Sequence, residues 1–368
     1  MRIVVLDIAA SKTGAMSVLR DFYGYISSTY GSAQGNGAHE WIFVTGVKDA
    51  LCASADRNIS IIVRDDVKAS SKNRLIFDLV TGGRWINALK PDVVFSLQNT
   101  LPRSLGKEIR TCLYIHQPSG FQRVKNFSIL KKDERHIANY QHFYHKLILA
   151  SAKRADISIV QTEWMRDALI RDTGIAPERV RKIAPNITDL SGYVHPGEFN
   201  ARNFIYPASD LPYKNHILIE EAKKLLEKRG YAPRVRYSKD GKLPREELFA
   251  EYNSGTLLFP SYIETFGMPL AEARQFGNPI LAADTEFARE VLDGYDNAYF
   301  FDAFDAGSLA DLMMDVMDGR LGPKTAVAVN EDAGSYSAIA KLLTSATKYS
   351  LKQASEDEVK EAESEKGE

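Results

Sequence analysis

Short runs rich in apolar residues alternate with longer amphipathic segments along the chain. Runs of this length and composition are typical of buried β-strands. They occupy residues 3–6, 41–44, 59–63, 93–96, 111–115, 155–162, 180–183, 203–206, 234–237, 256–259, 279–283 and 299–301. Helical spacing of apolar residues is seen between them at 18–26, 75–89, 163–172, 217–229, 245–254, 285–292, 308–317 and 335–351. This alternation predicts an α/β fold with parallel sheets, in which ligands bind at the carboxyl ends of the strands.

The first predicted strand runs into a loop of small residues and then into a helix, which is how a Rossmann-like domain begins. The loop contains Gly14 and Ala15, and its glycine fingerprint is incomplete. A second set of strands and helices starts after residues 191–201, which hold two glycines and a proline and predict a linker. The predicted units are a first domain at 1–190, a linker at 191–202, a second domain at 203–334, a helix at 335–351 and a Glu-rich, disordered tail at 352–368.

Composition narrows the class of protein. The 368 residues carry a net charge of −1, which gives no reason to expect a nucleic-acid partner. The two cysteines, Cys52 and Cys112, lie in apolar surroundings and favour a reducing compartment without a disulfide framework. The start of the chain is interrupted by Asp7 and does not resemble a signal peptide, and no apolar run approaches the 18 residues of a membrane span. We expect a cytoplasmic protein.

The most informative stretch is residues 260–283, PSYIETFGMPLAEARQFGNPILAA. Pro269 favours the first turn of a helix, because its missing N–H would have no partner there. The other N–H groups of that turn are free to bind an anion, and Gly267 lets a ligand approach the backbone. Glu264 lies just before this helix and Glu272 lies within it. Carboxylates accept hydrogen bonds from hydroxyl groups, so the stretch suits a ligand with phosphates and many hydroxyls, such as a nucleotide sugar.

The pattern PSxxExFGxPxxEAxxxGxP resembles the donor-sugar motif of retaining GT-B glycosyltransferases of family 4, the glycosyl transferases group 1. The resemblance implies two Rossmann-like domains with a cleft between them and a last helix that crosses back to the first domain. It implies that Glu264 holds the donor sugar and Glu272 the ribose. The backbone that would hold the sugar with Glu264 belongs to Phe266, Gly267, Met268, Pro269 and Leu270. The alternative is a capped helix in which Glu272 merely stabilises the N-terminus.

A lysine in the second domain extends the resemblance. Lys214 lies at a predicted loop-to-helix junction, where a cation can meet a diphosphate. The family pairs such a lysine with an arginine five residues earlier, and this chain has Ser209 there. One contact to the leaving phosphate is therefore missing or supplied elsewhere. The family also shows two glycines in the first loop, where this chain has Gly14 and Ala15. The alternative for Lys214 is a surface lysine.

His116 follows the predicted strand 111–115 and precedes a Pro-Ser-Gly turn. It is either a histidine packed at a strand end or, as the resemblance implies, a residue that faces the cleft and contacts the donor sugar. The sequence His116-Gln117-Pro118 with Phe121 also resembles a bacterial surface-polysaccharide subgroup. Glu290, in the predicted helix 285–292, is expected to face the cleft.

Residues 123–154 are basic and contain interspersed aromatic residues. They are either the solvated face of a helix or a peripheral contact with the inner face of the plasma membrane. His136, His142 and His145 lie in this segment without a carboxylate or thiol at a convincing spacing, so no metal site is predicted.

Together these features predict a retaining, metal-independent hexosyltransferase with no cofactor. It would use a nucleotide diphosphate sugar as donor and a glycan or polyprenyl-linked saccharide as acceptor, in the synthesis of O-antigen, capsule or exopolysaccharide. His116 and Glu264 are the predicted catalytic residues. Two alternatives stay open. One is a nucleotide-sugar 2-epimerase, and the other is an inactive subunit that binds a nucleotide sugar, which Ser209 and Ala15 motivate.

Overall fold

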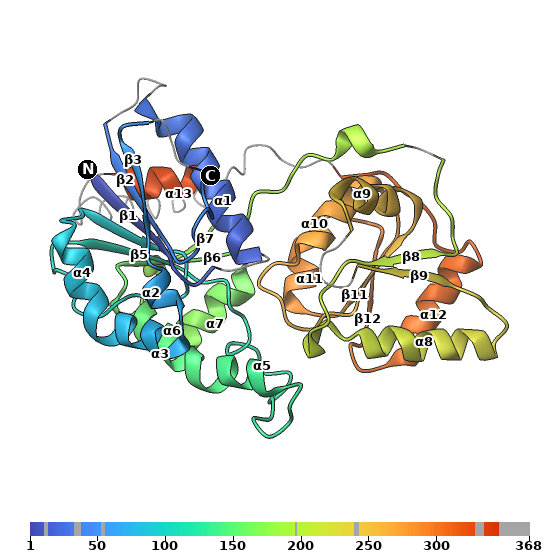
Figure 1. Cartoon of the computed structure of the whole chain (residues 1–368). Coiled ribbons are helices and arrows are strands. Elements are labelled where there is room, and N and C mark those ends of the chain that lie inside the picture. Colours follow the sequence, from blue (N-terminus) through green and yellow to red (C-terminus); the bar gives the residue numbers. More distant parts are fainter. Residues whose placement is uncertain are drawn as a thin grey trace, which may run out of the picture.

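The computed structural model describes residues 1–10, 14–32, 38–52, 56–195, 197–238, 243–327 and 335–345. Two parallel sheets lie side by side, each covered by helices (Figure 1). The first has seven strands in the order β3-β2-β1-β4-β5-β6-β7, and the second has five in the order β12-β11-β10-β8-β9. The predicted α/β class with two Rossmann-like domains is confirmed. The predicted tail at 352–368 and the last residues of the predicted helix 335–351 lie outside the described residues.

The first sheet is formed by β1 (Arg2–Asp7), β2 (Glu40–Thr45), β3 (Ile59–Val63), β4 (Val93–Ser96), β5 (Arg110–Tyr114), β6 (Ile157–Val160) and β7 (Val180–Lys182). Its helices are α1 (Gly14–Tyr30), α2 (Asp65–Lys68), α3 (Ser71–Ile76), α4 (Gly82–Ala88), α5 (Arg135–Asn139), α6 (His145–Arg154) and α7 (Glu163–Thr173). Side chains of β1 alternate between two cores: Ile3 and Val5 pack with α1, and Val4 and Leu6 pack on the other face. Burial on both faces explains why central strands of this sheet, such as β1 and β4, are nearly continuous apolar runs.

The second sheet is formed by β8 (Asn203–Tyr206), β9 (Arg234–Tyr237), β10 (Thr256–Phe259), β11 (Ile280–Ala283) and β12 (Ala298–Phe301). Its helices are α8 (His216–Lys228), α9 (Arg245–Ser254), α10 (Met268–Ala273), α11 (Glu286–Val291) and α12 (Ala306–Met317). β10 lies in the middle of this sheet, paired with both β8 and β11. The loop that leaves its carboxyl end therefore starts from the best supported part of the domain.

The last described helix, α13 (Ser335–Thr344), returns to the first domain. Tyr336, Ile339 and Leu343 are buried in the core that contains α1. The Arg110 guanidinium donates to the carbonyls of Leu342 (2.6 Å) and Ser345 (2.8 Å), which satisfies groups that a helix end leaves without partners. The chain thus crosses between the domains twice, and the predicted return of the last helix is confirmed.

Candidate active site

The loop after β10 carries the predicted donor motif. It turns at Gly267, whose φ of +92° lies in the left-handed region, where residues with a Cβ atom are disfavoured. A Cβ there would also come within 3.1 Å of the Leu270 side chain. Gly267 precedes α10, which has Pro269 in its first turn. The helix tightens into a 3-10 turn and ends at Gly277, whose φ is +74°. The starting and stopping residues predicted from sequence thus have the backbone conformations that they favour.

Lys214 and Glu264, which lie 50 residues apart in the sequence, form an ion pair. Their side chains are only 17% and 16% exposed, so the pair is partly shielded from solvent. The Ser261 hydroxyl donates to the same Glu264 oxygen that Lys214 contacts, at 2.7 Å. The structure therefore brings the predicted phosphate-binding cation and the predicted sugar-binding carboxylate together at the carboxyl edge of the second sheet.

Asn215 connects the two segments that bear this pair. It has a φ of +60° at the start of α8, and its side-chain amide donates to the carbonyls of Ala303 (2.7 Å) and Pro260 (3.5 Å). Ser209 lies nearby and is half-buried, and its carbonyl is 3.0 Å from His216 Nε2. Sequence reasoning missed Ser261 and Asn215. The only available signals were the Pro-Ser step before Glu264 and an Asn beside Lys214.

Glu272 lies on α10 with its side chain 12% exposed. Burial raises the pKa of its carboxyl group, and the opposing effects of Arg245 and the Tyr252 hydroxyl are smaller. The Tyr252 hydroxyl donates to Oε2 at 3.3 Å, and Arg245 Nη2 is 3.7 Å from Oε1. A ligand hydroxyl would add a favourable partner to a carboxylate that is costly to keep charged.

His116 lies at the carboxyl end of the first sheet, directly after β5 and Ile115. Its backbone N–H donates to Asn99 Oδ1 at 2.7 Å, and its Nε2 is 3.2 Å from Asn99 Nδ2. Because Oδ1 already accepts from an N–H, the amide Nδ2–H must point at the ring. Nε2 therefore accepts, and the proton of the neutral ring is on Nδ1. Nδ1 is buried with no hydrogen-bond partner among the described residues. Burial lowers the pKa of His116 to about 4.

The first loop of the chain holds Gly14 and Ala15, which were predicted to bind the donor. Gly14 begins α1, and a Cβ there would meet no atom within 4 Å, so the fold does not require glycine at this position. Ala15 is half-buried against the core that contains α1. No described contact joins either residue to Lys214 or Glu264. Asp7, which was not predicted, is buried at the end of β1, where burial raises the pKa of its carboxyl group to about 7.

The three histidines of the basic segment have separate partners. His142 Nε2 is 3.0 Å from the Phe127 carbonyl, His145 Nε2 is 3.5 Å from Asp172, and the His136 ring packs on Tyr140. Within the described parts of the chain, no group of three or more His, Cys, Asp or Glu could hold a metal ion. In the same ranges, no helix is long and apolar enough to cross a membrane.

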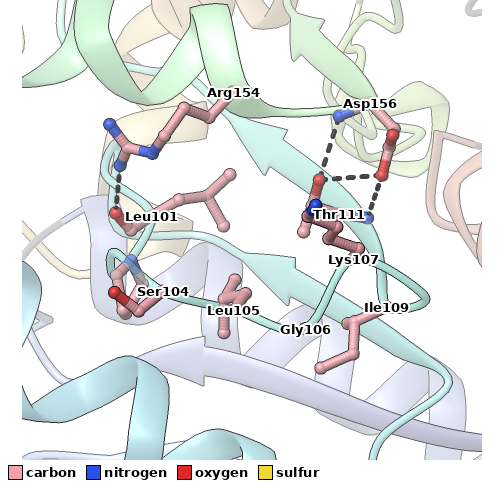
Figure 2. Close-up of a pocket in the computed structure, with 10 residues that line it drawn as sticks. Leu101, Ser104, Leu105, Gly106, Lys107, Ile109, Thr111, Arg154 and Asp156 are labelled. Carbon is pink, nitrogen blue, oxygen red and sulfur yellow. Dashed lines mark hydrogen bonds between the residues drawn. The ribbon is translucent and has the colours of Figure 1, made fainter.

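A small pocket of about 170 Å³ lies elsewhere, on the first domain (Figure 2). Its polar wall pairs Asp156 with Thr111, whose backbone N–H and hydroxyl donate to Asp156 at 2.8 and 2.9 Å. Arg154 donates to the Leu101 carbonyl at 2.7 Å. Thr111 and Asp156 lie at the amino ends of β5 and β6, the edge of the sheet opposite His116. This pocket is therefore not part of the predicted site, because it lies at the opposite edge of the sheet and its polar groups already bind one another.

Both the second domain and the whole chain resemble known proteins. Residues 212–334 match the family model described as Glycosyl transferases group 1. A sequence search of curated proteins found no match. Sucrose-phosphate synthase from Thermosynechococcus elongatus is similar over 99% of both chains, with a TM-score of 0.59 and 13% identity.

Two further solved structures share the fold. The lipopolysaccharide outer core galactosyltransferase WaaB gives a TM-score of 0.55 at 16% identity, over 88% of this chain and 92% of that one. Anabaena HepE in complex with UDP and glucose gives 0.55 at 15% identity, over 98% and 100%. TarM matches at 16% identity with a TM-score of 0.46, and there the chain spans only 56% of the known protein. The chain therefore has the GT-B fold, and residues 212–334, which carry Lys214, Glu264 and Glu272, match the model of the glycosyl transferases group 1.

Proposed function

We propose that this protein is a retaining glycosyltransferase that moves a hexosyl group from a nucleotide diphosphate sugar to a glycan or lipid-linked acceptor. The observation that carries the proposal is the convergence of Lys214, Glu264 and Ser261 beside Gly267, within the domain that matches the group 1 model. A cation, a carboxylate and a loop with a positive φ suit a ligand that combines phosphates with sugar hydroxyls.

Each residue has a chemical task in this proposal. Negative charge grows on the diphosphate as the glycosidic bond breaks, and Lys214 would stabilise it without a metal ion. Glu264 and the backbone from Phe266 to Leu270 would hold the sugar hydroxyls, and Glu272 would hold the ribose. Without donor, Lys214 and Glu264 neutralise each other. Binding would exchange this contact for two others, Lys214 with the diphosphate and Glu264 with the sugar.

His116 would act from the opposite domain. Its Nδ1–H is a donor without a partner among the described residues and is covered in the donor-free structure, so the atoms over it would have to move when the sugar binds. A neutral imidazole would then donate to a sugar oxygen without adding charge near an oxocarbenium-like centre. Its lowered pKa keeps this form populated at neutral pH. His116 would therefore orient the reacting sugar, while the leaving charge is stabilised on the other side of the cleft.

The acceptor and the setting are the finer part of the proposal. We place the reaction in the synthesis of a surface glycan such as O-antigen, capsule or exopolysaccharide, on the strength of the sequence resemblance around His116. Two solved neighbours, a lipopolysaccharide galactosyltransferase and HepE in complex with UDP and glucose, are compatible with a saccharide acceptor and a uridine donor. The reaction would take place in the cytoplasm.

The experiment that tests the function is a donor panel with released nucleotide as the readout. UDP-, GDP- and dTDP-sugars are incubated with and without a membrane-lipid extract, for the wild type and for Glu264→Ala as the inactive control. Release from one donor that the extract stimulates and the substitution abolishes is expected. Conversion of the donor to an epimer without acceptor would favour the 2-epimerase. Saturable binding without release under every condition would favour the inactive binding subunit.

We further propose that the basic segment, residues 123–154, contacts an anionic membrane surface. Four of its apolar side chains point to solvent: Val124, Ile129, Leu130 and Phe143 are 53%, 56%, 84% and 53% exposed. Arg123 and Lys131 beside them are 59% and 65% exposed, and each also contacts a carboxylate, Asp172 and Glu134 respectively. The opposite side of the segment is fixed, because Phe127, Ile137 and Ala138 are buried in the core that contains Tyr262. Exposed apolar groups with cations around them suit the headgroup region of a bilayer.

Vesicle binding tests this contact. Replacing Leu130 by Asp is expected to weaken the affinity for vesicles rich in phosphatidylglycerol, measured by sedimentation, by about tenfold. The substitution adds a negative charge at the most exposed of these apolar positions, and it removes a Leu side chain that would be buried in the bilayer. Ile217→Asp, at a position 72% exposed on α8 of the other domain, is the matched control. Equal binding by both variants and the wild type would contradict the proposal.

A further inference from the structure

The two domains touch directly beside the donor loop. Thr162 lies at the N-cap of α7 and is fully buried. A threonine there usually accepts a hydrogen bond from the first turn of its own helix, but this side chain makes no such bond. Its hydroxyl instead donates to the carbonyl of Thr265 in the other domain, at 2.8 Å. Thr265 is the residue that follows Glu264.

The same helix end is capped from across the cleft. Both carboxylate oxygens of Glu290, on α11, accept the backbone N–H of Glu163 at 2.9 Å. Lys182 Nζ lies 3.4 Å from Glu290 and 3.2 Å from Glu163, so one ammonium bridges a carboxylate of each domain. Glu290, which the sequence predicts to face the cleft, thus contacts Glu163 of the first domain. Glu163 is the first residue of α7, so its N–H has no acceptor within the helix and is satisfied by the second domain.

We propose that Thr162, Lys182 and Glu290 form an interdomain latch that sets the position of the donor loop against His116. The contacts support the latch itself, and its expected effect on sugar transfer rests on the proposed function. β6, which leads into Thr162, pairs with β5, which leads into His116, and the Ile115 N–H donates to the Ile159 carbonyl at 2.9 Å. Thr162 and His116 therefore follow adjacent strand ends. A bond from Thr162 to Thr265 fixes the loop of Glu264 relative to that edge.

The latch separates two steps that depend on different residues. Lys214, Glu264 and Glu272 all lie in the second domain, so donor binding does not need the latch. Transfer needs His116 of the first domain at the correct distance from the sugar. Displacing a reacting group by about 1 Å can cost about 100-fold in rate. Thr162 and Glu290 are thus positioning residues whose loss should lower kcat and leave donor affinity unchanged.

Hydrogen exchange in the donor-free protein tests the contact itself. In Glu290→Ala, the amide of Glu163 is expected to exchange at least about tenfold faster, because its only described acceptor is lost. Peptides from the donor loop around Thr265 are expected to exchange faster in Thr162→Val, and Thr162→Ser should restore the wild-type rate. Glu286→Ala, at an exposed position on the same helix α11, is the matched control. Since Thr162 is buried, Glu290→Ala alone decides the outcome if Thr162→Val does not fold.

Kinetics and binding test the consequence. With UDP as the binding probe, Glu290→Ala is expected to keep the wild-type Kd and lose about tenfold in kcat for the donor that the wild type uses. Unchanged exchange at Glu163, or a UDP Kd that weakens in parallel with kcat, would overturn the latch. Absence of turnover in the wild type would contradict the proposed function, and the exchange experiment would still decide whether the latch exists.

Discussion

Lys214→Met is expected to lower kcat/KM for sugar transfer by about 100- to 1000-fold, the effect typical of losing one preorganised group that stabilises a leaving charge. The expected loss lies mainly in kcat, since the charge on the diphosphate grows as the bond to the sugar breaks. Ser209 stands where the sequence resemblance implies an arginine with the same task, so Lys214 would carry more of the stabilisation in the proposed mechanism. Steady-state kinetics on the donor found by the panel measure the effect.

The donor-free ion pair supplies the control for this prediction. Lys214→Met leaves Glu264 half-buried with only the Ser261 hydroxyl as a described donor, which is expected to lower the free energy of unfolding by about 1–3 kcal/mol. Glu264→Gln in the same chain should recover most of that stability without recovering activity. Lys214→Arg should retain the charge and part of the rate. Full activity in Lys214→Met, or recovery of activity in the double variant, would contradict the assigned role.

Much of the fold could be predicted from the sequence because its strands are buried on both faces. Such strands are continuous apolar runs, as in β1 and β10, and a predicted strand overlaps each of the twelve described strands. Gly267, Pro269 and Gly277 marked the donor helix because each has a backbone preference that does not depend on the rest of the protein. The roles of the site residues stay predictions, although the structure places Lys214 against Glu264.

The remaining features depend on partners that are distant in sequence. Thr162 lies 103 residues before Thr265, and a threonine before a helix predicts a local cap, so no local pattern could indicate a contact between domains. Asn99 shows the same limit, since its contact with His116 exists only because β4 and β5 are neighbours in the sheet. In the basic segment, α5 and α6 are joined by a π-helical turn at Tyr140–Tyr144, which residue spacing did not indicate.

The pH dependence of His116 has a defined sign. Its pKa in the folded protein, about 4, lies below the ordinary value of 6.5, so the folded state binds fewer protons than the unfolded state between these values. His116 therefore contributes a loss of stability as pH falls from 6.5 towards 4, by at most about 1.4 kcal/mol per pH unit. Above pH 6.5 the contribution is complete, and the ring is neutral with its proton on Nδ1.

Asn99→Asp is expected to reverse that arrangement and to lower kcat by about 100-fold. The new carboxylate can still accept the His116 backbone N–H, but its other oxygen can only accept, so the ring proton moves to Nε2 and Nδ1 loses its donor. The negative charge also raises the pKa of His116, so the acidic limb of kcat should move towards neutral pH. Nitrogen chemical shifts of the ring report the tautomer, and the pH profile of kcat reports the titration. His116→Gln, whose amide does not titrate, should lose the acidic limb and retain part of the rate. An Asn99→Asp protein with the wild-type profile and rate would show that His116 does not act through Nδ1–H.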